Sequence, residues 1–259
     1  MNKRALTMTV ALFIFGLSVV ALATHVINNS SKKTLLVFLP AAGKRVWQEL
    51  IPLFEKRYGV EVEAVYGSSG RLLQQAYVSE RGDVLGSATP PYMNKAVEYG
   101  LVYPETVSYV ACMRPAILVP KDVNVSGLDD LIKRGIRILM CDPEGCAVGK
   151  FFKYALAKEG LWEKISKKVV GYTENFSKLI AALLVGKAEA ALGWDVAARW
   201  YPGKLKAVPL DLAGPYEPCI EVAVLKSTKN LGLAKLFVKF ITSKEALEKC
   251  REYGYSPPR

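Results

Sequence analysis

Short strand-like segments alternate with helical segments along most of this 259-residue chain, and this alternation limits the fold more than any other feature. Residues 35–39 form an apolar run that is typical of a buried strand, and a helical pattern follows Gly43. Alternating residues predict a strand over 60–65, and a helix over 71–79 follows a turn of glycine and serine. A repeat of this kind indicates a mostly parallel sheet with helices on both faces.

The alternation starts again after a long strand-like stretch at residues 109–121. A strand is predicted over 136–141, a helix over 149–158, and a further apolar strand over 218–226. A further helix is predicted from Phe176 onward, before the last of these strands. Its apolar residues fall on one face: Phe176, Leu179, Ile180, Leu183 and Leu184. The two blocks predict two similar α/β lobes joined by two long strands.

Smaller features refine three of the helices. Pro52 interrupts the first helical pattern, so we expect a kink or a restart there. Gly186 is expected to end the helix that starts near Phe176. The last helix is expected to open with a capping box, in which Thr242 is paired with Glu245.

The first 33 residues have a different character from the rest of the chain. Two positive charges in residues 1–4 precede an uncharged, mostly apolar segment at 5–23, which ends in an Ala-Leu-Ala cleavage pattern. This is the organisation of a secretory signal, although 19 such residues also just span a bilayer. Residues 1–23 are therefore a signal peptide or an N-terminal anchor, and 24–33 are a polar tether. In both cases we expect a periplasmic or cell-surface protein.

Composition excludes several kinds of chemistry. The only histidine is His25, in the tether, so catalytic triads and multi-histidine metal sites are excluded. The net charge of +11 points to nucleic acid, a membrane surface or a small anion. Export and the lack of Lys/Arg runs with interleaved aromatic residues argue against nucleic acid. Most of the positive charge is expected to lie on solvated helix faces.

Several helices are preceded by loops of small residues. The starts of such helices offer unpaired backbone N–H groups and the positive end of a dipole, and these can bind an anion without a charged side chain. The alternative is that these loops are ordinary turns of an α/β domain. The candidate ligand-binding residues in these loops are Ala42, Gly43, Ser68, Ser69, Val148 and Phe176.

Six segments between residues 34 and 258 share their order and spacing with one protein family. They are FLPAAG (38–43), YGSSGRLLQQ (66–75), GDVLGSAT (82–89), CDPEGCAVGK (141–150), GKAE (186–189) running into Trp194, and EYG (252–254). This pattern resembles the molybdate-binding proteins, which are the exported solute receptors of molybdate ABC transporters. In that family the oxyanion lies between two lobes and is held by backbone N–H groups, two serine hydroxyls and a tyrosine hydroxyl.

The resemblance assigns roles to individual residues. Ser69 matches the second serine of the family, and Val148 and Phe176 match residues that donate backbone N–H groups. Gly43 stands where the first serine is expected, and Trp194 stands where the tyrosine is expected. The resemblance therefore supports an oxyanion receptor better than it supports a molybdate receptor.

Neighbouring side chains are candidates to replace the missing donors. Ser68, Lys44 and Arg71 lie close in sequence, although the two cations are otherwise explained as solvated residues at helix starts. Trp194 can donate one indole N–H, or it can simply pack within its lobe. Asp195 would repel an anion unless it orients a neighbouring donor.

The five cysteines leave at least one free thiol. In two-lobed receptors the connecting strands run side by side, and here these strands carry Cys112 and Cys219. The resemblance therefore implies a Cys112–Cys219 disulfide across the hinge. Cys141 and Cys146 bracket a turn and could instead pair with each other.

The resemblance thus implies an α/β fold of two Rossmann-like lobes joined by two hinge strands, as in type II periplasmic binding proteins. One lobe is predicted to contain residues 34–111 and 219–259, and the other residues 112–218.

The function implied is capture of a tetrahedral oxyanion, molybdate or tungstate, and its delivery to an ABC transporter permease. We expect a monomer with no cofactor, no enzymatic activity and no nucleic-acid partner, in which any metal is bound only through the oxyanion's oxygens. The alternatives are a receptor for another small anion, such as sulfate, phosphate or an organic anion, and an enzyme on the same fold.

Overall fold

A computed structural model describes residues 33–258 of the chain. The predicted signal or anchor, His25 and all but the last residue of the predicted tether lie outside the described residues. Within residues 33–258, no helix is long and apolar enough to cross a membrane.

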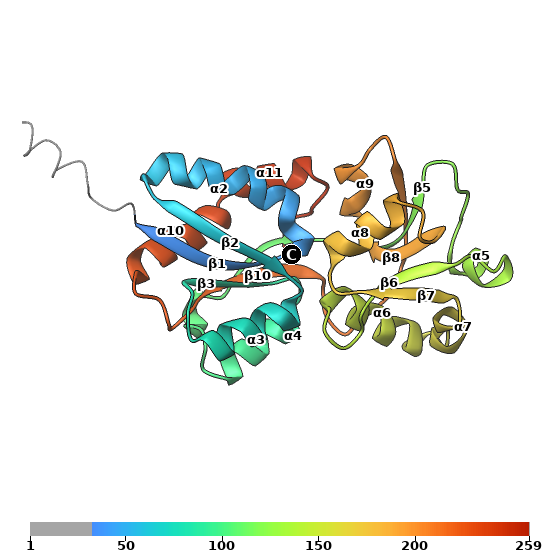
Figure 1. The fold of residues 1–259 in the computed structure, drawn as a ribbon, viewed down its shortest axis with the longest axis horizontal. Coiled ribbons are helices and arrows are strands. Elements are labelled where there is room, and N and C mark those ends of the chain that lie inside the picture. The colour runs from blue at the N-terminus through green and yellow to red at the C-terminus, as the bar shows by residue number, and fades with distance from the viewer. Residues whose placement is uncertain (1–32, 259) are drawn as a thin grey trace, which may run out of the picture. The chain divides into compact units, whose positions relative to one another are not determined.

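The first lobe is built on a five-stranded sheet in the order β2-β1-β3-β10-β4 (Figure 1). Helices α3 and α4 contact each other, and α2, α10 and α11 form a second contacting group. The two groups cover opposite faces of the sheet (Figure 1). The elements are β1 (Thr34–Pro40), η1 (Ala41–Gly43), α2 (Lys44–Tyr58), β2 (Glu61–Gly67), α3 (Ser69–Ser79), β3 (Val84–Ser87), α4 (Pro90–Glu98), η2 (Pro104–Thr106), β4 (Ser108–Cys112), β10 (Cys219–Val224), α10 (Leu231–Ile241) and α11 (Lys244–Glu252).

The second lobe repeats this plan, with a sheet in the order β7-β6-β8-β5-β9. Helices α6 and α7 contact each other on one side of the sheet, and α8 covers the other side (Figure 1). The elements are β5 (Pro115–Pro120), α5 (Leu128–Lys133), β6 (Ile138–Cys141), α6 (Ala147–Lys158), α7 (Trp162–Ser166), β7 (Val169–Thr173), α8 (Phe176–Leu184), β8 (Ala190–Trp194), α9 (Val196–Trp200) and β9 (Leu205–Pro209).

Each sheet has one strand that runs against the other four. In the first lobe this strand is β10, which pairs antiparallel with β3 and β4, and in the second lobe it is β5, which pairs antiparallel with β8 and β9. Both are the strands by which the chain enters a lobe after crossing from the other one. The prediction of two Rossmann-like lobes joined by two hinge strands is confirmed, and the sheets are mostly parallel, as expected.

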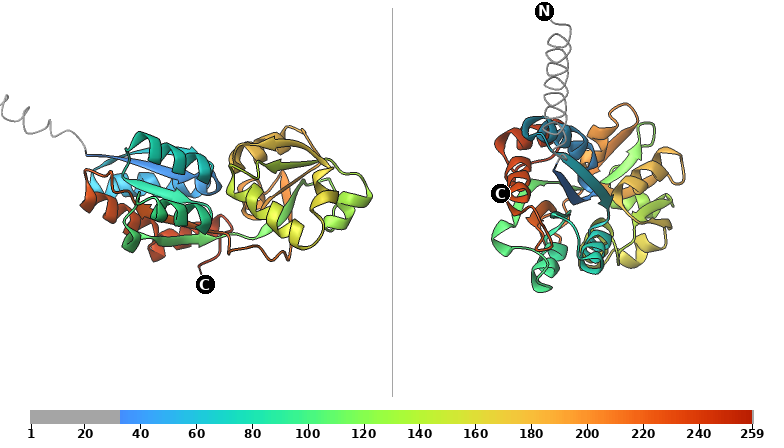
Figure 2. Two further views of the ribbon diagram at one scale, coloured as in Figure 1. Left: turned by 90° about the horizontal axis from the view of Figure 1, so that it is seen from below. Right: turned by 60° about the vertical axis from the view of Figure 1, so that its left-hand side comes forward.

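The long strand-like stretch at residues 109–121 serves both lobes. Its first part is β4 and its second part is β5, and Met113 and Arg114 lie between them at the crossing. The Met113 amide donates to the Pro218 carbonyl at 2.9 Å, so the two crossing segments are bonded to each other. Figure 2 shows both connections between the lobes.

At two helices the structure decides details of the prediction: of the kink or restart expected at Pro52 it excludes the restart, and it places the last N-cap one residue later than predicted. Helix α2 runs without a restart across Pro52, which is exposed, so water can reach the backbone carbonyl that loses its partner. Helix α11 is capped by Ser243, whose hydroxyl accepts from the Ala246 amide at 3.2 Å, and not by Thr242. The Thr242 hydroxyl instead donates to the Val238 carbonyl at 2.8 Å in the last turn of α10. The predicted end of α8 at Gly186 is confirmed, because Gly186 has a φ of 73° directly after the C-cap.

Candidate functional site

A cavity of about 10 Å³ lies where the starts of several helices from the two lobes meet. This is room for about one water molecule. No side chain of Asp, Glu, Lys, Arg or His lines it. The lining residues are Pro40, Ala41, Ala42, Gly67, Ser68, Ser69 and Ala88 from the first lobe, and Cys146, Ala147, Val148 and Phe176 from the second.

Helices α3, α6 and α8 begin at this cavity, with Ser69, Ala147 and Phe176 as their first residues. The N-cap residues of α3 and α6, Ser68 and Cys146, make no side-chain capping hydrogen bond. The first N–H groups of these helices are therefore left without a cap, and the positive ends of their dipoles meet at one point. This arrangement favours a small anion in the cavity.

Two serine hydroxyls stand at the start of α3. The Ser69 oxygen accepts from the Ala88 amide at 2.9 Å, so its own proton remains free to be donated into the cavity. The Ser68 side chain is 6% exposed and makes no hydrogen bond in the structure. Ala88 was not among the predicted site residues, although its segment was among those that matched the family.

The structure brings together five of the seven predicted ligand-binding residues and leaves out two. Ala42, Ser68, Ser69, Val148 and Phe176 line the cavity. The two that do not line it are Gly43 and Trp194.

A serine at position 43 would have no room for its side chain. A Cβ atom at Gly43 would lie 2.5 Å from the indole of Trp47, which is fully buried and donates to the Pro40 carbonyl at 3.1 Å. The indole therefore fills the space that a serine side chain would need. The hydroxyl that the family resemblance implies at this position cannot be restored without moving Trp47.

Trp194 is a core residue of the second lobe. Its ring centroid lies 5.1 Å from that of Phe151 and 6.0 Å from that of Phe152, and it is fully buried. The prediction that its indole replaces the tyrosine hydroxyl at the site is corrected accordingly. Packing on aromatic neighbours, which the sequence left open as the alternative, explains its position at the end of β8.

The charged residues that the sequence analysis considered near the site, the candidate donors Lys44 and Arg71 and the carboxylate of Asp195, do not line the cavity. Arg71 forms an ion pair with Glu174 of the other lobe, and its side chain is 64% exposed. Asp195 accepts from both the backbone and the side chain of Arg114 at the hinge, at 3.0 and 3.1 Å. The Lys44 ammonium lies over the ring of Tyr66.

Three tyrosine hydroxyls that sequence reasoning missed hold the walls of the site. Tyr255 donates to the Ala42 carbonyl, Tyr216 to the Ala147 carbonyl at 3.4 Å, and Tyr92 to the carbonyl of Glu144 at 3.2 Å. Burial raises the pKa of Tyr216 to about 12, so its hydroxyl stays a neutral donor. No periodic pattern marks these residues in the sequence, because each acts over a long separation.

The lobes also contact each other directly around the cavity. The Ser177 hydroxyl of α8 donates to the Ala41 carbonyl at 3.2 Å. A Cβ atom at Gly70, in the first turn of α3, would lie only 2.8 Å from the Gly145 carbonyl oxygen of the other lobe. Together with the Arg71–Glu174 pair, these contacts define a closed arrangement of the two lobes.

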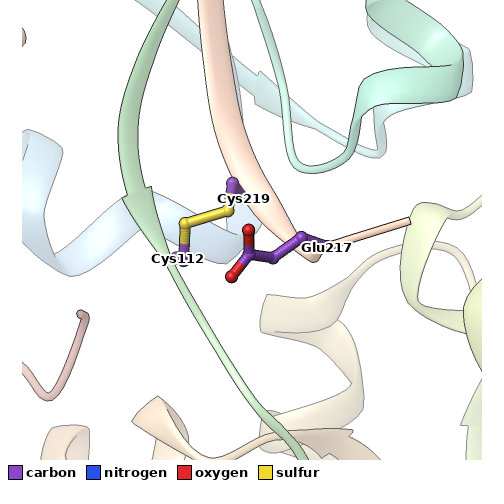
Figure 3. A group of neighbouring side chains, drawn as sticks. All are labelled: Cys112, Glu217 and Cys219. Carbon is purple, nitrogen blue, oxygen red and sulfur yellow. A yellow bond between two sulfur atoms is a disulfide. The ribbon is translucent and has the colours of Figure 1, made fainter. Parts of the chain in front are cut away.

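The hinge carries the disulfide Cys112–Cys219, the pairing that the resemblance implied (Figure 3). Its two strands are paired at this point. The Glu217 carboxylate lies beside it, and these three side chains are close enough to share an ion. Both sulfurs are in the disulfide bond, so neither is a thiolate ligand for a metal. The alternative pairing is absent, because Cys141 and Cys146 are free.

Comparisons with known proteins identify relatives along almost the whole described chain. A family model described as "bacterial extracellular solute-binding protein" matches residues 35–256. The molybdate-binding protein ModA of Escherichia coli is 26% identical over 245 residues, which cover 91% of this chain and 93% of that protein. The resemblance to molybdate-binding proteins is thereby confirmed.

Two solved structures show the same fold. The periplasmic molybdate-binding protein of Azotobacter vinelandii matches with a TM-score of 0.74 at 21% identity, over 87% of this chain and all of that one. The sulfate-binding protein SubI of Mycobacterium tuberculosis matches with a TM-score of 0.76 at 16% identity, over 87% of each chain. Relatives with this fold thus include receptors named for two different tetrahedral oxyanions.

Proposed function

We propose that this chain, which belongs to the bacterial extracellular solute-binding proteins, captures a tetrahedral oxyanion between its lobes. The oxyanion is molybdate or tungstate. The observation that supports the proposal most is the meeting of uncapped helix starts and the Ser68 and Ser69 hydroxyls at one cavity. Such donors are neutral, and they bind an anion by hydrogen bonds and helix dipoles.

The absence of a carboxylate from the cavity lining distinguishes among the anions. Molybdate, tungstate and sulfate carry no proton at neutral pH, whereas phosphate does and therefore calls for an acceptor. Asp195, whose carboxylate could act as that acceptor, does not line the cavity and is bonded to Arg114 instead. A buried phosphate proton would be left without a partner, and this costs about 1–3 kcal/mol. The site therefore favours a fully deprotonated oxyanion.

Sulfate is the second candidate, because the cavity is small and sulfate is the smallest of these three dianions. Room for about one water molecule does not hold four oxygens, so the lobes must part to admit either ion and the cavity must widen around it. The contacts of Arg71, Ser177 and Gly70 across the cleft would break while the ion enters and would form again when the lobes close on it.

The chain delivers the ion to an ABC transporter permease and does no chemistry on it. Among the cavity-lining residues the only titratable side chain is Cys146, so no acid–base pair is available for catalysis. The working form is an exported monomer without a cofactor, held at the membrane or released according to the fate of residues 5–23.

A thermal-shift and calorimetry panel tests this function. Molybdate and tungstate are expected to raise the Tm by mass action, with sulfate as the second candidate and phosphate and arsenate as controls. If none of these tetrahedral oxyanions changes the Tm or releases heat, the proposed function is wrong.

A further inference from the structure

A second pocket lies between the lobes, and the function proposed above does not use it. Its volume is about 320 Å³, which at the volume of water in the liquid is space for roughly ten water molecules. Helix α2 of the first lobe forms one side, and helix α8 together with the end of α9, both of the second lobe, forms the other. Its lining includes Lys44, Arg45, Gln48, Ser177, Trp200 and Tyr201.

The first side of this pocket is positively charged. Lys44 and Arg45 are the first two residues of α2, both are half-buried, and no Asp or Glu side chain lines the pocket. Neither cation forms an ion pair or a side-chain hydrogen bond with any residue between 33 and 258. Withdrawing an unpaired charge from water is costly, and the positive end of the α2 dipole adds to the same potential. The pocket therefore favours a ligand with negative charge.

Both cations keep their hydrogen-bond donors available for such a ligand. The Arg45 Cζ atom lies 5.0 Å from the ring centroid of Tyr201, and the Lys44 Nζ atom lies 5.7 Å from that of Tyr66. A cation over an aromatic face is held by the charge distribution of the ring and not by an N–H···O bond. The Arg45 guanidinium therefore retains the N–H groups that pair with a carboxylate in two parallel hydrogen bonds.

The second side of the pocket is partly apolar. Ile180, Ala181 and Trp200 line it, and the largest of them, Trp200, is 9% exposed. Burying a carbon skeleton against these side chains is favourable, because it removes apolar surface from water. A tetrahedral inorganic ion is smaller and has no apolar part, so it would leave most of the pocket to water. The two sides together suit a small organic anion.

We propose that this pocket binds a small organic anion with two or three carboxylate groups, and that this ligand strengthens oxyanion binding by holding the lobes together. The carboxylates bind Lys44 and Arg45, and the carbon skeleton packs on Ile180 and Trp200. The coupling to oxyanion binding rests on the proposed function, whereas the binding of the organic anion does not.

The pocket and the candidate anion cavity share a wall. The rings of Phe176, which lines the cavity, and of Trp200, which lines the pocket, pack with their centroids 5.4 Å apart. Ser177 also lines the pocket, and its hydroxyl donates to the Ala41 carbonyl in the cavity lining at 3.2 Å. Parting of the lobes would break this bond and move α2 away from α8.

This shared wall explains the expected coupling. A ligand that contacts both sides of the pocket binds the closed form of the protein more tightly than the open one. The oxyanion does the same from the cavity, so each ligand tightens the binding of the other by the same factor. We expect the organic anion to lower the Kd of the oxyanion by about fivefold or more, which is the lower end of the usual range for such coupling.

Binding in the pocket is tested by calorimetry with succinate and tricarballylate, which have no hydroxyl group to chelate molybdate. Both are expected to bind the wild type, and uncharged succinamide is not. Arg45→Gln is expected to weaken this binding by about tenfold or more, because a hydrogen bond to a charged group is lost. Ala181→Phe is expected to weaken it similarly, because it keeps both cations and fills the pocket. The control is Lys56→Gln, which removes a charge from an exposed position near the other end of α2 and is expected to bind as the wild type does.

Three outcomes would contradict the site. No binding of either carboxylate to the wild type, or wild-type affinity in Arg45→Gln or Ala181→Phe, would overturn the pocket as a carboxylate site. Sulfate or phosphate binding that is lost in Arg45→Gln would overturn the organic class of the ligand. A carboxylate that is displaced by a bound oxyanion would lie in the cavity instead, and this would overturn a separate pocket.

The coupling is tested by titrating the oxyanion that binds in the panel into protein saturated with succinate. Its Kd is expected to be lower than without succinate, and Arg45→Gln is expected to bind the oxyanion without this gain. An equal or higher Kd in the presence of succinate overturns the coupling. If no oxyanion binds under either condition, the proposed function and the coupling fail together, while the effects of Arg45→Gln and Ala181→Phe still decide whether the pocket binds carboxylates.

Discussion

At the scale of single residues, the Ser69 hydroxyl is the best-placed donor at the candidate site. Its oxygen is already bonded to the Ala88 amide, so its proton has one direction left, into the cavity. The residue is 2% exposed, so a bound anion would find no water to replace this donor.

We therefore expect Ser69→Ala to weaken oxyanion binding by about 1–3 kcal/mol, as loss of a buried donor to a dianion requires. Calorimetry with the anion that binds in the panel measures the change. The matched control is Ser166→Ala, whose hydroxyl contacts only the Glu163 carbonyl within α7, at 3.4 Å. An unchanged affinity in Ser69→Ala would remove this residue from the site.

The residue scale is also where sequence reasoning was least reliable. Ser69, Val148 and Phe176 line the cavity because each is the first or second residue of a helix, a position that the local pattern predicts. Gly43 and Trp194 do not, because the aromatic side chains that pack against them, those of Trp47 and Phe151, come from other turns or elements.

At the scale of elements, strand β10 carries a buried carboxyl group. Glu221 is 4% exposed, and burial raises its pKa to about 7, from the usual 4.5 of a glutamate side chain. A raised pKa means that the folded state holds the proton where the unfolded state releases it. Stability is therefore lost as the pH rises from about 4.5 to about 7.

In the wild type, ionisation of Glu221 is expected to lower the free energy of unfolding by roughly 3 kcal/mol over this pH range. We expect Glu221→Gln to remove this decrease. Urea denaturation at a series of pH values between 4 and 8 measures it. Glu98→Gln, at an exposed position of α4, is the control and is expected to keep the wild-type profile. A wild-type profile in Glu221→Gln would show that the carboxyl does not ionise in this range.

The hinge disulfide joins two elements that are far apart in the sequence. Cys112 and Cys219 are separated by 107 residues, which include the whole second lobe. Closing a loop of this length restricts the unfolded chain and stabilises the folded one by about 4–5 kcal/mol in the chain-entropy account.

We expect the free energy of unfolding of the double variant Cys112→Ser, Cys219→Ser to be lower by this amount, so that it unfolds at a lower urea concentration. The variant is expected still to bind the anion, because the cavity lies away from the hinge residues. Denaturation without reductant, together with calorimetry, checks both parts. The variant Cys250→Ser controls for the loss of a buried cysteine. Full stability in the double variant would contradict the expectation.

At the scale of the whole molecule, the Arg71–Glu174 ion pair joins α3 of the first lobe to the loop before α8 of the second. Lys178 and Arg71 together lower the pKa of Glu174, so the pair stays charged at neutral pH. Because the pair exists only while the lobes are together, it belongs to the closed form.

We expect Arg71→Ala to weaken binding by about 0.2–1 kcal/mol, the usual range for an exposed pair, mainly through faster release. High salt is expected to weaken wild-type binding more than binding by this variant. The matched control is Arg57→Ala, which breaks a bidentate pair with Glu245 inside the first lobe, at 2.8 Å. Slower release in Arg71→Ala would contradict the role in closure.

The alternation of strands and helices determined the fold class, because the period of apolar residues sets each element and a helix between successive strands is the crossover that parallel strands need. The sequence also marked the helix starts that line the cavity, since small residues and serines precede them. These features are local, and a local pattern is visible in the chain itself.

Only the tertiary structure decided which side chains complete the site. Tyr255 and Tyr216 reach the carbonyls of Ala42 and Ala147 over long sequence separations, and no local rule foresees such contacts. The structure likewise put the Trp47 indole where a serine side chain at Gly43 would stand, and brought the Cys146 thiol to the cavity wall. The physical reason is that packing and hydrogen bonding between distant elements depend on their final arrangement, which the pattern of one segment does not contain.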